Sequence, residues 1–101
     1  MHLLLIHQNF PGQFRDLAPA WLAAGHQITA LGSCSDAPAG KAWEGLRYLR
    51  YQFQDDDAPS AEQRGAAVAE ICRQLWASDQ APDLVLVHTA WGEALGLKTI
   101  W

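Results

Sequence analysis

Short runs of apolar residues recur along the chain and are separated by segments with helical spacing. Residues 3–7 and 84–88 predict strands buried on both faces of a sheet, because apolar residues there follow one another without alternation, and residues 26–31 predict a further strand. Residues 46–53 alternate between apolar and polar side chains, which predicts an edge strand with one side in water. Strands that alternate with helices in this way predict a three-layer α/β fold with a parallel sheet.

Two segments carry the apolar stripe of a helix that packs on a sheet. The apolar residues of the first are Phe14, Leu17, Ala18, Trp21 and Leu22. Pro19 lies among them and must either kink the helix or fall in its first turn, because proline has no N–H to donate. Gly25 then predicts a left-handed helix end. The second helix is predicted over residues 61–78, and another begins at Thr89. No helix is predicted between the second and third strands, so the direction of the third strand stays open.

The ends of the first and fourth strands carry the candidate chemistry. In the common strand order 3-2-1-4 these strands are neighbours, and parallel α/β sheets bind ligands beyond the carboxyl ends of such strands. His7 and His88 end the two strands and would face one crevice. There an imidazole can bind a hydroxyl or phosphate group, or transfer a proton near neutral pH. The alternative for each histidine is a polar side chain that only ends a strand.

The loops that follow these histidines form the rest of the candidate site. Phe10, Pro11 and Gly12 lead from the first strand to the amino end of a helix, where N–H groups attract anions and a glycine lets a ligand approach the backbone. Trp91 and Gly92 hold the corresponding place after the fourth strand. We therefore expect both loops to lie at the same edge of the sheet.

The composition narrows the classes of function. A net charge of −4 and scattered basic residues leave no patch for nucleic acid or a membrane surface. No apolar stretch approaches the ~20 residues of a membrane-spanning helix, and no signal peptide is recognisable, so a cytoplasmic protein is expected. Cys34 and Cys72 predict neither a disulfide nor a zinc site. Clustered carboxylates favour hard cations, but a solvated loop explains Asp55, Asp56 and Asp57 fully, so no metal site is predicted.

Three segments of the chain resemble one protein family. They are residues 7–19, 23–31 and 82–95, with the sequences HQNFPGQFRDLAP, AAGHQITAL and PDLVLVHTAWGEAL. Together they resemble the amino-terminal domain of the retaining, nucleotide-sugar-dependent glycosyltransferases of family 4, which have the GT-B architecture. The first and last segments are moderately specific, and the middle of the chain, residues 33–60, carries little likeness.

The resemblance implies two Rossmann-like domains that face each other across a cleft. Residues 1–101 would be part of the amino-terminal, acceptor-side domain, whose sheet is an incomplete half. The family's histidine after the fourth strand falls on His88, which implies a catalytic position near the reacting carbon of the donor sugar. The implied substrate-binding residues are His7, Phe10, Pro11, Gly12, Trp91 and Gly92. Enzymes of this architecture generally need no bound metal, and no cofactor is expected.

The chain departs from the family pattern in two places. The doubled glycine often found in the first loop is a single Gly12 here, and the glutamate-containing donor-binding motif of the second domain is absent. The parent protein would transfer a sugar from a nucleotide-sugar donor to a glycan or lipid acceptor, whereas this chain alone would be inactive. Two other readings stay open, a stand-alone α/β binding module and an interaction protein that forms a homodimer through its sheet edge or its five tryptophans.

Overall fold

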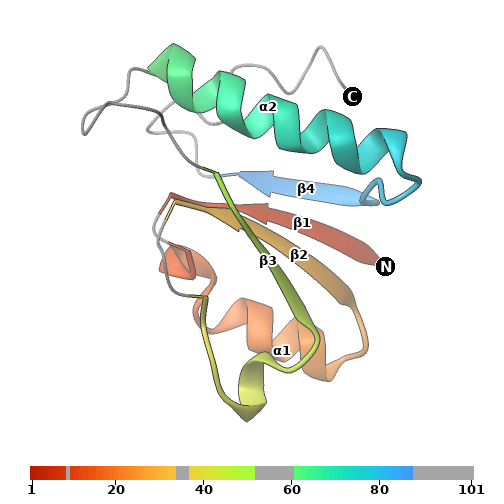
Figure 1. Ribbon diagram of the computed structural model, residues 1–101. Coiled ribbons are helices and arrows are strands. Elements are labelled where there is room, and N and C mark those ends of the chain that lie inside the picture. The colour runs from red at the N-terminus through yellow and green to blue at the C-terminus, as the bar shows by residue number, and fades with distance from the viewer. Residues whose placement is uncertain (9, 34–36, 52–60, 88–101) are drawn as a thin grey trace.

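Four parallel strands form the centre of the computed structural model, which describes residues 1–8, 10–33, 37–51 and 61–87 (Figure 1). The strands are β1 (His2–Ile6), β2 (Gln27–Gly32), β3 (Leu46–Arg50) and β4 (Leu84–Val87). Their order in the sheet is β3-β2-β1-β4, and every pair is parallel. The predicted order 3-2-1-4 is therefore confirmed, and the open question of the third strand's direction is answered.

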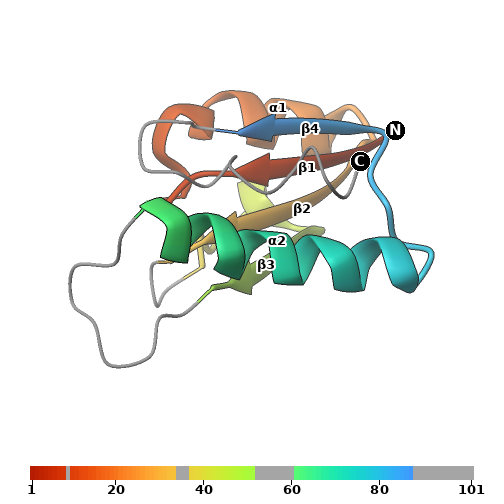
Figure 2. The ribbon, with the colours of Figure 1, turned by 90° about the horizontal axis from the view of Figure 1, so that it is seen from above.

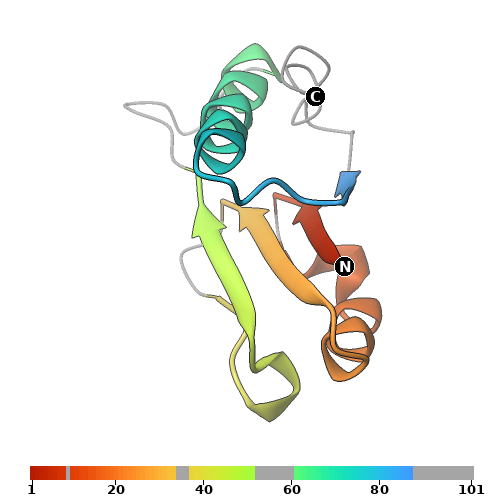
Figure 3. The same ribbon diagram turned by 90° about the vertical axis from the view of Figure 1, so that its right-hand side faces the viewer.

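Helices cover both faces of the sheet and make a three-layer α/β fold. Helix α1 (Leu17–Ala23) lies on one face and the longer α2 (Ala61–Ala77) on the other, as the side view shows (Figure 3). Seen from above, α2 extends along the direction of the strands (Figure 2). Two 3₁₀ turns, η1 (Gly12–Phe14) and η2 (Lys41–Trp43), complete the α1 side. Within the described part of the chain, no helix is both long and apolar enough to cross a membrane.

The core is divided by the sheet into two apolar clusters. The cluster under α2 consists of Leu4, Ile6, Leu31, Tyr51, Val68, Cys72 and Leu75. The cluster on the α1 side consists of Leu3, Leu5, Phe10, Phe14, Ala18, Ile28 and Ala30. Successive residues of β1 enter opposite clusters, because side chains alternate across a strand. Both faces of β1 are therefore buried, as its unbroken apolar sequence predicted.

The first helix is shorter than its apolar stripe predicted. Phe14 belongs to η1 and is separated from α1 by two residues, so the helical register does not run through from Phe14. Phe14 and Ala18 are still buried, but Leu17 is 50% exposed, and its assignment to the buried stripe was wrong. Pro19 falls in the first turn of α1, where a missing N–H costs nothing.

The carboxyl end of α1 shows why Gly25 was a correct stop signal. Its φ is +93°, and its N–H donates to the Leu22 carbonyl at 3.0 Å. The N–H of His26 donates to the Trp21 carbonyl at 3.1 Å, which completes the paired hydrogen bonds of a Schellman motif. The other predicted bounds shift slightly, since β3 ends at Arg50 instead of residue 53 and α2 ends one residue early. The helix expected from Thr89 lies outside the described residues.

Candidate functional site

The loop after β1 folds back tightly at the carboxyl edge of the sheet. The His7 N–H continues the ladder with β2 by donating to the Leu31 carbonyl at 3.1 Å. The His7 carbonyl then accepts from the Phe10 N–H at 3.0 Å, and the Pro11 carbonyl accepts from the Phe14 N–H at 2.7 Å. Two successive turns thus place Pro11, which is half-buried, beside the end of the strand.

His7 and Gly12, two of the predicted site residues, are in direct contact. A Cβ placed on Gly12 would lie 2.5 Å from Nε2 of His7 and 2.6 Å from its Cε1, where ordinary contacts begin at 3.4 Å. The φ of Gly12 is +45°, a conformation that favours glycine. The imidazole also meets Phe14 edge to face, with ring centroids 6.5 Å apart. The close packing of the His7 ring therefore explains why a glycine is needed at position 12. The sequence analysis expected a different reason, namely that a glycine lets a ligand approach the backbone.

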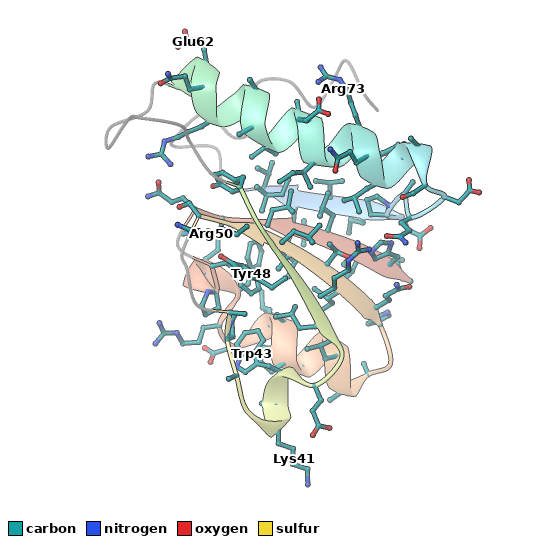
Figure 4. All side chains as sticks on the ribbon, in the orientation of Figure 1. Lys41, Trp43, Tyr48, Arg50, Glu62 and Arg73 are labelled. Carbon is teal, nitrogen blue, oxygen red and sulfur yellow. The ribbon has the colours of Figure 1, made fainter. Side chains whose placement is uncertain are left out.

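Phe10 belongs to this loop, and its side chain lies in an aromatic cluster. Its side chain is only 2% exposed. The rings of Phe14, Trp43 and Tyr48 surround it, with centroids 6.2, 6.0 and 6.1 Å away. Figure 4 shows Trp43 and Tyr48 on the α1 side of β3. In this structure Phe10 positions the loop through its packing, and its predicted contact with substrate stays a prediction.

The loop after β2 joins the ends of the three strands β1, β2 and β3. The Gln8 carbonyl accepts two hydrogen bonds from Ser33, from its N–H and from its Oγ, both at 2.9 Å. The Ser33 carbonyl accepts from Nε of Arg50 at 3.1 Å, and the Tyr51 N–H donates to the Gly32 carbonyl at 3.0 Å. These bonds hold the carboxyl ends of the strands at one common edge.

Gly32 lies at the tightest point of this edge. A Cβ on Gly32 would lie 2.6 Å from the Tyr48 hydroxyl, 3.1 Å from the His7 carbonyl and 3.1 Å from Cβ of Phe10. The side chain of Tyr48 therefore crosses Gly32 at the end of β2, and its ring packs against that of Phe10 in the β1 loop. Only a residue without a side chain leaves room for this arrangement.

Gly32, Ser33 and Arg50 belong to this edge, although the sequence analysis did not single them out. A signal for the first two was present, because a glycine followed by a serine ends a buried strand next to the strand of His7. The same rule that selected the loop after the first strand applies to the loop after the second. Arg50 gave no comparable signal, since an exposed arginine on an edge strand is common.

His88, Trp91 and Gly92 lie outside the described residues, as do Cys34 and the three aspartates at 55–57. The described ranges contain no group of three histidine, cysteine or acidic residues that could hold a metal ion. Burial raises the pKa of the Cys72 thiol to about 11. This cysteine lies in the core under α2, away from the edge of the sheet.

Comparison with known families gives a match. A family model described as glycosyl transferase family 4 group matches residues 24–101, which is most of the chain. The match begins after the first of the three segments on which the resemblance rested, at the second residue of the segment 23–31, and includes all of the segment 82–95. Comparison with curated proteins and with solved structures gives no match.

Proposed function

Since the chain belongs to the glycosyl transferase family 4 group, we propose that it is the amino-terminal, acceptor-side part of a retaining enzyme of GT-B architecture. A second domain binds the nucleotide of the sugar donor, and this chain supplies the facing wall of the cleft to a glycan or lipid acceptor. The observation that carries the proposal is the family match over residues 24–101.

The arrangement of the strand ends supports this role. Strands β1 and β4 are neighbours and end level with each other, with Ile6 opposite Val87. His7 and His88 are the next residues of the two strands in the sequence. Ligands of parallel α/β sheets bind beyond strand ends where the order of strands reverses, and β1 is such a point in the order β3-β2-β1-β4.

In the proposed reaction the bond between the sugar carbon and the diphosphate breaks, a bond forms from that carbon to the oxygen of an acceptor hydroxyl, and the hydroxyl proton passes to the departing nucleoside diphosphate. We assign His88 to the donor sugar near the reacting carbon. His7 is half-buried, and its ring is held by Gly12 and Phe14, so it can present an imidazole nitrogen to a substrate hydroxyl with little loss of side-chain freedom. Pro11 and Gly12 contribute the turn beside it, and Trp91 and Gly92 complete the proposed substrate contacts.

We propose further that the chain alone does not transfer sugar. Transfer needs donor and acceptor to be held together in a reactive geometry, and this accounts for a large part of the rate that an enzyme provides. One wall of a cleft cannot hold both substrates. The two domains together would be needed for turnover.

The first test is the intact mass of the native polypeptide that carries this amino terminus, because a GT-B enzyme must be several times larger than 11.1 kDa. If the native product has the mass of this chain, the proposal is wrong and a small binding module is favoured. Measurable turnover of a nucleotide sugar by the chain alone would refute its inactivity.

The second test compares two histidines in the full-length enzyme. His88→Ala should lower kcat by about 10²–10⁴, the range for loss of a group that acts on the reacting atoms. His26→Ala is the matched control, because His26 lies at the opposite end of the sheet, just before β2. Equal effects of the two substitutions would remove His88 from the proposed site.

A further inference from the structure

Arg50 brings a positive charge to the carboxyl edge of the sheet, where the candidate site lies. It is the last residue of β3, and its side chain is exposed (Figure 4). Its Nε donates to the Ser33 carbonyl at 3.1 Å. Ser33 in turn donates from its N–H and its Oγ to the carbonyl of Gln8, the residue after His7. A chain of hydrogen bonds therefore links the guanidinium group to the loop of the candidate site.

The register of the strands places Arg50 in one row with His7. Ile6 lies opposite Leu31, and the N–H of His7 continues this ladder. His7 therefore lies opposite Gly32, which is in turn the partner of Arg50 in β3. Neighbouring strands are about 5 Å apart, so about 10 Å separate the backbones of His7 and Arg50 across the sheet. A ligand that lies over the end of β2 can reach both residues.

Arg50 and His7 also project to the same face of the sheet. Side chains alternate along a strand, so Arg50 shares the face of Tyr48, which packs against the cluster on the α1 side. The His7 ring reaches the same side, where it meets Phe14 edge to face. By the same alternation Arg47, three residues before Arg50, projects to the opposite side of the sheet. Arg50 therefore faces the candidate site, whereas Arg47 does not.

The guanidinium group of Arg50 keeps donors for a ligand. Arginine has five N–H donors, and the hydrogen bond to Ser33 uses the one on Nε. Within the described part of the chain, no carboxylate pairs with Arg50, whereas Arg73 pairs with Glu70 at 3.4 Å. The two terminal amino groups of an arginine form a fork that matches the oxygens of a phosphate or a carboxylate. Arg50 is thus suited to bind an anionic group that arrives at the strand ends.

We propose that Arg50 determines specificity for the acceptor by binding an anionic group on it, either a phosphate or a carboxylate. This proposal rests on the proposed function of the strand ends. The acceptor lies over the end of β2, with its anionic group at Arg50 and its hydroxyl groups toward His7. The class of acceptor is thereby narrowed to sugars and lipids that carry a negative charge about 10 Å from the hydroxyl held at His7, the spacing of two strands.

The test compares three small probes that share one sugar ring. Methyl glucoside 6-phosphate carries a phosphate, methyl glucuronide carries a carboxylate, and methyl glucoside is neutral. Each is titrated into the chain and followed by NMR of the backbone amides and the arginine Nε–H groups. At least one charged probe should bind about tenfold or more tightly than the neutral one, because hydrogen bonds between charged groups are the strong ones. The shifts should include the Nε–H of Arg50 and the amide of Ser33.

Variants of the chain separate recognition of the anion from a merely structural role of the arginine. Arg50→Gln should remove the preference for charged probes and leave the affinity for methyl glucoside unchanged. Arg50→Lys should keep part of the preference, since it keeps the charge but loses the fork. The matched control is Arg47→Gln, on the same strand and the opposite face, which should keep the whole preference. A structural role would weaken the binding of all three probes alike, so the ratio of affinities is the readout.

Several outcomes would overturn the proposal. They are equal affinity for the three probes, no binding of either charged probe, shifts away from the strand ends, and an unchanged ratio in Arg50→Gln. Binding that appears only after Asp55, Asp56 and Asp57 are replaced by asparagine would also overturn it, because the chain's own carboxylates would then occupy Arg50. Failure of the transferase role would appear in the native mass and in the kcat of His88→Ala, so the two failures can be told apart.

Discussion

The contact between Gly12 and His7 permits a quantitative test of how the candidate site is built. Substituting Gly12 with alanine places a Cβ at 2.5 Å from the imidazole, in a residue whose φ is +45°. The left-handed backbone costs a residue with a side chain about 1–2 kcal/mol. Displacement of a packed ring adds about 1–3 kcal/mol, as for other overpacked sites. We therefore expect Gly12→Ala to lower the free energy of unfolding by about 2–5 kcal/mol.

Gly25 provides a control that separates these two effects. Its φ is +93°, but a Cβ there would meet no atom within 4 Å. Gly25→Ala should therefore cost only the backbone contribution, about 1–2 kcal/mol. In a His7→Ala background the ring is absent, and Gly12→Ala should then cost the same small amount. The double-mutant cycle between Gly12 and His7 should yield a coupling of about 1–3 kcal/mol.

Urea denaturation of the single and double variants measures all four corners of this cycle. The urea concentration at the midpoint of unfolding should shift, whereas the dependence of the unfolding free energy on urea concentration should stay the same. The reason is that the substitutions change stability and not the surface exposed on unfolding. A coupling near zero would refute the reasoning, since it would mean that the ring is free to move away from the added methyl group. Gly12 would then be explained by its backbone conformation alone.

Three further predictions concern the core and the helix ends. Burial raises the pKa of Cys72 from 9.0 to about 11, so the unfolded chain loses this proton first, and the free energy of unfolding should fall by about 2 kcal/mol from pH 9 to pH 11. Urea titrations at these pH values should show the fall with Cys72 present and a smaller slope in Cys72→Ala. Asp79 follows α2 and has a φ of +60°, a conformation that favours glycine. Asp79→Gly should therefore raise the free energy of unfolding by up to about 1 kcal/mol, and the melting temperature with it, whereas Asp79→Ala should raise neither. Thr29 is buried and its Oγ1 lies 2.8 Å from Nε2 of His2, so Thr29→Val should cost about 1 kcal/mol in urea, and no cost would mean that this hydrogen bond contributes nothing.

The order of the strands could be predicted from features that a short segment carries by itself, whereas the direction of β3 is known only from its parallel pairing with β2. The continuous apolar run of β1 indicates burial on both faces, and its central position between two helical layers provides this. The similar run of β4 predicted the same burial, but Leu84 is exposed and residues 85–87 are half-buried, so that prediction was wrong. The segment of β3 alternates between apolar and polar residues, which fits an edge strand with one side in water. Gly25 marked a helix end correctly because its left-handed conformation is set within a few residues.

Leu17 shows where local patterns fail. Its spacing from Phe14 fits a single helix, but the chain makes a 3₁₀ turn first and starts α1 after a break. The packing of Phe14 against Phe10 and His7 decides where that break falls. Those partners belong to the preceding loop and strand, so helical spacing alone does not contain the information.

The candidate site shows the same limit more strongly. The residue types at the strand ends were predictable, because histidines that follow buried parallel strands lie at the edge where ligands bind. The contacts between the loops were not predictable. Ser33 and Arg50 donate to the backbone carbonyl groups of Gln8 and Ser33, and a backbone carbonyl is present at every residue, so the sequence does not mark these partners. Gly32 could be recognised as special only once Tyr48 was seen to cross it. A sequence therefore indicates which chemistry reaches the edge, whereas the support that holds it there depends on strands brought together by the fold.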